Sequence, residues 1–366
     1  MTAIPRWMAE SPILLRPNRV WRMYSGGKMI DALQGSASML DTEYPEEWVG
    51  SCVQASNPGT HFRKGEGMAL VSVDNVAVPL HDIIREFPEE MLGARHVATY
   101  GNNPALLVKL LDAAVRLMIH AHPDKAFAGN HLNSCFGKTE AWFVLGTRPD
   151  VEDPYVLIAF REEVSRERYR QMIDAQDVES MKSVMHRVPV RAGSVVYVRA
   201  GVPHAIGEGV FMVELQEPTD YSIILERTCD TFVFREDESF LGLPPDLTLS
   251  CIDHRVYSTD DVRRELLICP RVLRKEGESA EVQLLGYDTT ECFSGRRLDV
   301  QGELNDITDD RHAILIIIDG EGSLVHRHGS IPLRRGTEVF VPSAVGQHLF
   351  RSERGMTVFK CLAARP

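Results

Sequence analysis

The sequence predicts a mainly β protein made of two jelly-roll barrels with a helical insertion. Many short apolar runs, rich in β-branched residues, alternate with turns that contain glycine and proline, as in sandwiches and barrels. An internal repeat supports two barrels, because residues 191–198 (RAGSVVYV) align with residues 335–341 (RGTEVFV) when Gly193 is set on Gly336. A charged amphipathic stretch at 162–186 interrupts the β pattern and predicts one or two inserted helices.

The composition is that of a globular chain that is long enough for two or three domains. The 366 residues are 44% hydrophobic and 25% charged, with a net charge of −12, which argues against nucleic acid or an anionic membrane as partner. No apolar run approaches the roughly 20 residues that span a bilayer, and no signal-peptide pattern is visible. The seven cysteines form no CxxC pair and are expected to be reduced thiols, so we expect a cytoplasmic protein.

The first half of the chain contains the predicted elements in a clear order. An extended piece at 13–22 ends before Gly26 and Gly27, and the first convincing strand follows at 46–54. Residues 78–96 have helical spacing, although Pro88 must kink or divide the helix. A nearly continuous apolar strand is expected at 105–111.

Later strands divide the chain into two domains. They are expected at 142–145, 155–160, 188–190, 194–198, 210–215 and 221–225, and then at 282–287, 313–318 and 338–341. The charged segment 227–265, with a short helix near 260–266, reads as a linker. We therefore predict a first domain over 1–226, which includes the helical segments 78–96 and 162–186, and a second domain over 266–366.

A His-x-His motif lies in a predicted strand at 115–122. His120 and His122 share one face of that strand, about 7 Å apart, and could close on a metal ion. The motif alone is weak, since two histidines can share a solvated strand by chance. Glu140 and His204, beside further strands, are additional candidate ligands. In the repeat His204 falls on Gln347, so the second barrel is expected to hold no metal unless His348 compensates.

Six motifs of the first barrel together resemble those of one enzyme family. They are EEWVGS at 46–51, LLVKLLD at 106–112, AHPDK at 121–125, GKTEAW at 137–142, VPHA at 202–205 and VELQ at 213–216. The chain resembles a type I mannose-6-phosphate isomerase (phosphomannose isomerase) of the short bacterial form, in the cupin superfamily. The resemblance implies cupin-type barrels and a zinc ion held by His120, His122, Glu140 and His204. The C-terminal barrel matches only in pattern.

Two positions depart from the family pattern. The first ligand is usually glutamine, and a set of three histidines and one glutamate also suits iron or manganese. The family's catalytic arginine has Ile224 at its place, with Arg227 and Arg199 as candidate substitutes. The identity of the sugar, and catalysis itself, stay open at this point.

The family reaction, aldose–ketose isomerisation, requires three chemical elements. A metal ion polarises the sugar oxygens, a base moves the proton, and a cation stabilises the enediolate. Asp220 or Glu214 could act as the base, and Lys138 or Arg199 as the cation. Lys138 and Asp220 could equally be turn residues, whereas Glu214 should face the barrel interior, where an unpaired carboxylate is costly.

Three functions are compatible with these residues. The preferred one is a metal-dependent isomerase of mannose 6-phosphate or a related sugar. The alternatives are a non-catalytic sugar-binding or regulatory cupin and a three-His, one-Glu cupin oxygenase. The expected partner is a small sugar or sugar phosphate, and the chain is expected to be a monomer or homodimer. His131, in a loop, and His326 and His328, in an expected exposed hairpin, are read as non-functional.

Overall fold

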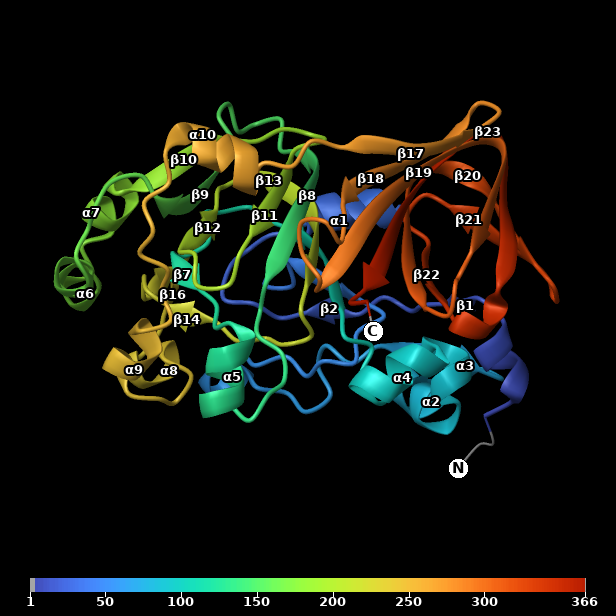
Figure 1. Cartoon of the computed structure of the whole chain (residues 1–366), viewed down its shortest axis with the longest axis horizontal. Coiled ribbons are helices and arrows are strands. Elements are labelled where there is room, and N and C mark those ends of the chain that lie inside the picture. The colour runs from blue at the N-terminus through green and yellow to red at the C-terminus, as the bar shows by residue number, and fades with distance from the viewer. Residues whose placement is uncertain (1–3, 366) are drawn as a thin grey trace.

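The computed structural model describes residues 4–365 and is mainly β with a cupin-like fold, as predicted. Figure 1 shows two β assemblies side by side. Strands between residues 19 and 224, apart from the hairpin at residues 70–79, form the left one, and the orange and red strands of the C-terminal part form most of the right one. The mainly β fold class is therefore confirmed.

The first assembly consists of two sheets. The six-stranded sheet has the order β11 (Val195–Val198), β8 (Glu140–Thr147), β13 (Val210–Gln216), β6 (Leu107–Asp112), β3 (Glu46–Val49), β2 (Arg19–Val20). The five-stranded sheet has the order β10 (Met185–Pro189), β9 (Tyr155–Phe160), β12 (His204–Ile206), β7 (His120–Ala121), β14 (Ile223–Ile224). One apolar cluster draws residues from both sheets, among them Val144, Met212 and Ile158, so the two sheets face one another.

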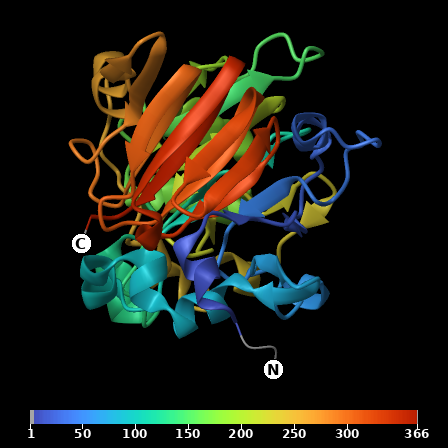
Figure 2. The ribbon, with the colours of Figure 1, turned by 90° about the vertical axis from the view of Figure 1, so that its right-hand side faces the viewer.

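The second assembly is built from one eight-stranded sheet. Its order is β1 (Ile13–Leu14), β22 (Glu338–Val341), β20 (Ala313–His326), β23 (Gln347–Ala363), β19 (Phe293–Ile307), β18 (Ser279–Leu285), β17 (Arg271–Glu276), and β21 (Gly329–Arg334) pairs with β20. Its long strands spread across the front of Figure 2. Because β1 pairs with β22, the N-terminal segment contributes to the C-terminal sheet.

Short helices cover the outside of both assemblies. The α-helices are α1 (Lys28–Gln34), α2 (Leu80–Glu86), α3 (Pro88–Leu92), α4 (Ala94–Tyr100), α5 (Lys125–His131), α6 (Arg166–Ala175), α7 (Val178–Ser183), α8 (Glu236–Ser239), α9 (Pro245–Leu249) and α10 (Thr259–Asp261). The remaining elements are η1 (Arg6–Glu10), η2 (Gly59–His61), η3 (Val262–Leu266), η4 (Ser343–Val345) and the hairpins β4 (Leu70–Val73)–β5 (Val76–Pro79) and β15 (Thr228–Cys229)–β16 (Phe232–Val233).

The helical predictions agree with the structure at their centres. Pro88 begins α3 and so divides the expected helix, since a proline at the first helical position loses no hydrogen bond. Two helices, α6 and α7, fill the predicted insertion and pack on the outer side of the five-stranded sheet. The segment 227–265 is more ordered than a linker, because it holds a hairpin and several short helices.

Some predicted strands differ from the observed ones. The His-x-His strand contains just His120 and Ala121, and the strand from Glu46 ends at Val49 before Gly50, whose φ is +60°. The long strands β19 and β23 were not predicted, because polar residues interrupt their apolar pattern and their length depends on pairing with each other. Within residues 4–365, no helix is long and apolar enough to cross a membrane.

Strand alternation directs charged residues into the first assembly. On β6 and β13, Leu110 and Val213 belong to the core shared with the second assembly. Their neighbours Lys109 and Glu214 therefore point to the opposite side, between the two sheets of the first assembly. This geometry brings several buried polar side chains to a common interior.

Candidate metal centre and its cavity

Three histidine rings meet inside the first assembly. His120 on β7 and His204 on β12 are direct partners across neighbouring strands, and their Nε2 atoms are 3.0 Å apart. His122 follows β7, and its ring centroid lies 4.9 Å from that of His120 and 4.8 Å from that of His204. All three side chains are buried, and one ring nitrogen from each lies within 4.8 Å of the others, so the cluster could hold a metal ion.

The hydrogen bonds of the rings favour metal binding. Each Nδ1 lies within hydrogen-bond distance of a backbone carbonyl oxygen. The distances are 2.9 Å from His120 to Met118, 2.8 Å from His122 to Tyr221 and 2.8 Å from His204 to Val202. A carbonyl accepts, so each Nδ1 carries the proton and each Nε2 presents a lone pair. Three Nε2 lone pairs that face one another repel, and a divalent cation bound between them removes that repulsion. Hydrogen bonds from Nδ1 to a backbone carbonyl are also the usual way in which metal-binding histidines are oriented. The residues present therefore fit a divalent ion.

Glu140, the first residue of β8, completes this cluster. Its Oε2 lies 3.1 Å from Nε2 of His122, and its Oε1 lies 3.4 Å from Nε2 of His204. Trp142 Nε1 donates to Oε1 at 3.0 Å, which orients the carboxylate. Burial raises the pKa of Glu140, but the Lys138 ammonium and His122 outweigh it and hold that pKa well below its ordinary value. Glu140 therefore stays an anion, as a metal ligand must.

Burial and neighbouring charges keep the imidazoles neutral. Burial lowers the pKa of all three histidines. For His122, burial and the nearby Lys138 ammonium together lower the pKa to about 3. Lys138 Nζ is 2.9 Å from Nε2 of His122 and 3.0 Å from Oε2 of Glu140. The ammonium donates to the exposed lone pair of His122, in agreement with the proton on its Nδ1.

A cavity of about 310 Å³ opens beside His120. Lys138, Glu214, Asp220 and Ile224 also line it. Ile224 lies next to His120 in the pairing of β14 with β7, and it is 3% exposed. An apolar side chain thus stands beside the histidine cluster.

A network of buried charges forms the opposite wall. Arg22 donates to both carboxylate oxygens of Asp220, at 2.9 and 3.1 Å, and to Glu46 at 3.0 Å. Lys109 Nζ lies 3.1 Å from Oε1 of Glu214, and Tyr24 donates to Glu46 at 2.6 Å. Each of these three carboxylates therefore has Arg22 or Lys109 within ion-pair distance.

The two candidate bases differ in their surroundings. Ser56 also donates its backbone N–H to Asp220, at 2.8 Å, so the Asp220 carboxylate is fully engaged. Burial raises the pKa of Glu214, against the opposite effect of Lys109, whose Nζ lies 3.1 Å from Oε1 of Glu214, whereas Asp220 is held by three donors. Glu214 is thus the more available of the two carboxylates.

The structure brings most of the predicted site residues together. His120, His122, Glu140, His204 and Lys138 form one cluster, and Glu214 and Asp220 line the cavity beside it. Arg199 and Arg227 lie outside the cavity lining, and Arg199 is exposed after β11.

Sequence reasoning missed three residues of the cavity wall. None of Arg22, Glu46 and Lys109 was among the predicted site residues. The signal available was the alternation of EEWV and LVKLL, which points Glu46 and Lys109 to the inner face. No local pattern marks Arg22, whose partner Asp220 is 198 residues away.

The second assembly has a different cluster at the end of β19 and β23. His348 Nε2 and Lys360 Nζ lie 3.2 and 2.5 Å from Oδ2 of Asp306. An ammonium therefore neutralises the carboxylate, and no second group of three metal-ligating side chains is found among residues 4–365. His326 and His328 lie at the exposed turn between β20 and β21, as expected.

Comparison with known proteins supports the family resemblance. Residues 285–356 match the family model "Mannose-6-phosphate isomerase, cupin domain", so the C-terminal assembly carries the resemblance too. A mannose-6-phosphate isomerase from Streptococcus mutans is 35% identical over 43% of this chain and 48% of that protein. A relative from Bacillus subtilis is 30% identical over 57% of this chain and 59% of its own length. The chain therefore spans about half the length of these two relatives. Another Bacillus subtilis relative aligns at 25% identity over 92% of the chain and 94% of its length.

Solved structures share the fold over nearly the whole chain. The crystal structure of mannose 6-phosphate isomerase from Bacillus subtilis has a TM-score of 0.74 at 20% identity and covers 96% of this chain and 99% of its own. A zinc-bound mannose 6-phosphate isomerase has a TM-score of 0.71 at 17% identity, with 97% and 100% covered. The resemblance in sequence is accompanied by a common architecture.

Proposed function

On the premise that the chain is a relative of the mannose-6-phosphate isomerases, we propose that it is a metal-dependent aldose–ketose isomerase. Its substrate class is mannose 6-phosphate or a related sugar, and its ion is zinc, as in the zinc-bound relative. The observation that carries the proposal is the convergence of three Nε2 lone pairs, each held by a carbonyl on Nδ1, beside a cavity of sugar size.

His120, His122, His204 and Glu140 would hold the ion, and among them His120 lines the cavity from which a substrate oxygen would approach. When bound, the ion polarises the carbonyl and hydroxyl oxygens at C1 and C2 of the sugar. The neutral imidazoles and the ionised Glu140 need no proton release before they bind it. The fold thus prepares the ligands for the ion.

Glu214 is the group that we assign as the base between C1 and C2. It is buried, lines the cavity and has a raised pKa, which brings a carboxylate closer to the basicity that proton transfer requires. Asp220 holds Arg22 in place and is assigned a positioning role, because its oxygens are already occupied.

Lys138 is the cation that we assign to the developing enediolate. Its ammonium is buried at the junction of the ligand cluster and the cavity, where a positive charge acts strongly on a nearby oxyanion. Lys109 supplies a second positive charge behind Glu214. Arg199 receives no role in this proposal, because it lies outside the cavity lining.

The experiment that tests the function combines metal analysis with a substrate panel. The zinc-loaded protein should interconvert an aldose and its ketose, measured by a coupled assay over several free sugars and sugar phosphates. Sugar binding without turnover would favour the non-catalytic cupin, which the apolar Ile224 beside His120 makes reasonable. Iron as the bound metal together with oxygen consumption would favour the oxygenase. Either result would overturn the isomerase proposal.

A further inference from the structure

The peptide group between Met118 and Ile119 makes two hydrogen bonds in opposite directions. Its carbonyl oxygen accepts from Nδ1 of His120 at 2.9 Å, and its N–H donates to Oε2 of Glu226 at 2.9 Å. The carboxylate of Glu226, the peptide group and the imidazole of His120 are therefore linked in one chain of hydrogen bonds. The far end of this chain is Nε2 of His120, which faces the histidine cluster.

Arg116 holds the carboxylate of Glu226 in this position. Its guanidinium donates to Oε1 at 2.5 Å and to Oε2 at 2.7 Å, and it also donates to the carbonyl oxygen of Leu117 at 2.8 Å. A bidentate ion pair fixes a carboxylate more firmly than a single contact does. Because Glu226 is only 3% exposed, water competes little for its oxygens.

The helical insertion anchors the segment that contains Glu226. Gln176, which follows α6, donates to the carbonyl oxygen of Leu225 at 3.0 Å and accepts from the N–H of Arg227 at 2.6 Å. The N–H groups of Leu225 and Glu226 both lie 3.0 Å from the carbonyl oxygen of Ile119. The backbone on both sides of Glu226 is thus fixed, and its side chain has a defined place beside the strand that carries His120.

A charged acceptor on one end of a peptide group changes the other end. A hydrogen bond from the Ile119 N–H to a carboxylate polarises the peptide, so that the carbonyl oxygen of Met118 becomes a stronger acceptor. A stronger acceptor for the Nδ1 proton raises the basicity of an imidazole and orients its ring. Glu226 should therefore strengthen the bond between His120 and a divalent ion without contact with that ion.

The other two histidines of the cluster have no such arrangement. The carbonyl that accepts from Nδ1 of His204 belongs to the peptide between Val202 and Pro203, and a proline nitrogen carries no hydrogen. The carbonyl that accepts from Nδ1 of His122 belongs to Tyr221, and within residues 4–365 no side chain accepts from the N–H of the same peptide group. The link to a carboxylate is specific to His120.

We propose that Glu226 is a positioning residue for the metal ligand His120 and raises the affinity of the centre for its ion through the peptide between Met118 and Ile119. The inference rests on the proposed metal centre of the isomerase and extends it to a carboxylate outside the cavity. Glu226 does not line that cavity, so its effect should appear first in metal binding and not in contact with a substrate.

The test measures the dissociation constant of zinc in Glu226→Gln by competition with a chromogenic chelator. This variant keeps the size of the side chain and removes its charge, and the constant should rise by about 10- to 100-fold, the usual cost of losing an outer partner of a metal ligand. Glu281→Gln is the matched control. It makes the same change at a buried carboxylate held by two arginines of the second assembly, and it should leave the constant unchanged.

The spectrum of the cobalt-loaded protein separates positioning from general stabilisation. The visible bands of cobalt report the ligands around the ion, so they should shift in Glu226→Gln and stay in place in Glu281→Gln. If circular dichroism shows that Glu226→Gln does not fold, Glu226→Asp replaces it. The shorter side chain keeps the charge but withdraws from the Ile119 N–H, so the zinc constant should again rise. An unchanged zinc constant and unchanged cobalt bands in the folded variant would overturn the inference.

The inference and the proposed function fail in different ways. If the unmodified protein binds no zinc, both are wrong. If it binds zinc and Glu226→Gln binds zinc equally well, only the inference is wrong. If the zinc-loaded protein isomerises no sugar, the proposed function is wrong, and a raised zinc constant in Glu226→Gln still sustains the inference.

Discussion

Each ring of the histidine cluster is oriented by a carbonyl close to its own strand. The acceptors for His120 and His204 are the carbonyls two residues earlier, so the local chain alone sets these two rings. His122 uses the carbonyl of Tyr221, which belongs to the segment before β14. The cluster therefore depends on the pairing of β14 with β7 as well as on local conformation.

Replacing His122 should abolish metal binding. We expect close to one metal ion per chain in the unmodified protein and close to none in His122→Ala, because a three-ligand remnant binds far more weakly. Metal content after dialysis, measured by mass spectrometry, checks this. His328→Ala, at an exposed turn, is the control and should retain the metal. An ion that survives in His122→Ala would place the site elsewhere.

Replacing Glu214 tests the assignment of the base. Glu214→Gln keeps the size of the side chain and removes the proton acceptor, so kcat should fall by about 10²- to 10⁴-fold. Metal content should stay unchanged, since Glu214 is not part of the ligand cluster. Asp220→Asn is the comparison, with a smaller loss that arises through Arg22. If Asp220→Asn is inactive and Glu214→Gln keeps ordinary turnover, the roles are reversed.

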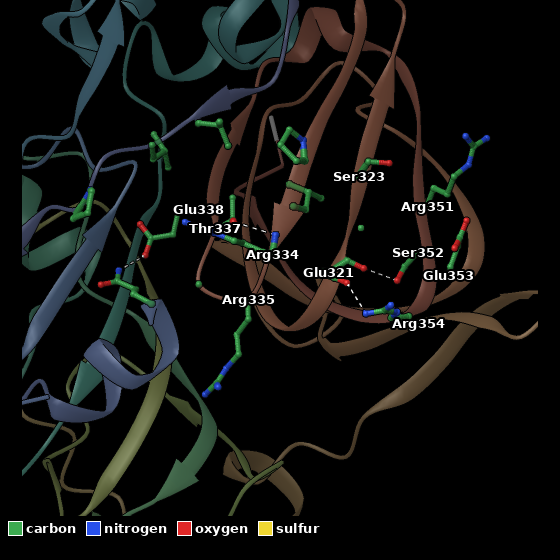
Figure 3. A pocket seen from close by; sticks show the side chains of 18 residues that line it. Glu321, Ser323, Arg334, Arg335, Thr337, Glu338, Arg351, Ser352, Glu353 and Arg354 are labelled. Atoms are coloured by element: carbon green, nitrogen blue, oxygen red, sulfur yellow. Dashed lines mark hydrogen bonds and ion pairs between the residues drawn. The ribbon is translucent and has the colours of Figure 1, made fainter. Parts of the chain in front are cut away.

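At the scale of elements, β3 and β22 bring two carboxyl groups to the boundary between the assemblies. Glu47 and Glu338 are both buried, and Glu338 points from its strand toward the first assembly in Figure 3. Gln34 of α1 donates to Glu338 at 3.0 Å, and the backbone N–H of Asn18 donates to Glu47. Burial raises the pKa of Glu47 to about 7. Burial and the charge of Glu47 together raise the pKa of Glu338 well above its ordinary value.

This carboxyl pair should make stability depend on pH. Above about pH 4.5 the two carboxyl groups lose their protons in the unfolded chain but keep them in the folded protein. The stability that the two protonated groups contribute is therefore fully present below that pH. It is lost as the pH rises through about 7, the pKa of folded Glu47. The free energy of unfolding should therefore decrease from pH 5 to pH 8, as measured by urea titration.

Glu338→Gln is the variant that checks this pH dependence. The amide can still pair with Gln34, but it carries no charge, so the decrease between pH 5 and pH 8 should become smaller. Asp299→Asn, on a 39% exposed side chain, is the control and should follow the unmodified protein. An unchanged slope in Glu338→Gln would show that another group causes the pH dependence.

At the scale of the whole molecule, one apolar core joins the two assemblies. It contains residues of the six-stranded sheet, such as Phe143 and Val213, and residues of the eight-stranded sheet, such as Phe359 and Ile316. Phe143 and Phe359 meet edge to face, with centroids 4.9 Å apart. Gly295 lies against Phe143, where a Cβ atom would come within 2.7 Å of the ring. The two assemblies are therefore packed as closely as a protein interior.

Phe359→Ala should lower the free energy of unfolding of the whole protein and not of one assembly alone. Loss of a buried phenylalanine costs about 3–5 kcal/mol, and because the core is shared, both assemblies should unfold in one transition. Urea unfolding followed by tryptophan fluorescence, to which the buried Trp21, Trp48 and Trp142 of the first assembly contribute, and by circular dichroism checks this. Phe62→Ala, at a 54% exposed ring, is the control and should cost little. Two separate transitions in the unmodified protein would show that the halves are independent.

The sequence by itself determined the mainly β class, the division of the helix at Pro88 and the set of residues around the histidine cluster. These features follow from short-range spacing, because strand alternation and motif order act within a few residues. Strand alternation singled out His120 and His122, although the strand that carries His120 is two residues long, whereas Glu140 and His204 were assigned as ligands through the resemblance to mannose-6-phosphate isomerases.

The tertiary structure alone decided which charges meet in the cavity. Arg22 and Asp220 are 198 residues apart, and Ile224 reaches His120 through the pairing of two-residue strands. Arg199 is near His204 in sequence but is exposed outside the cavity. Such partners depend on how sheets stack and on where the chain crosses between them, and residue spacing does not contain this information.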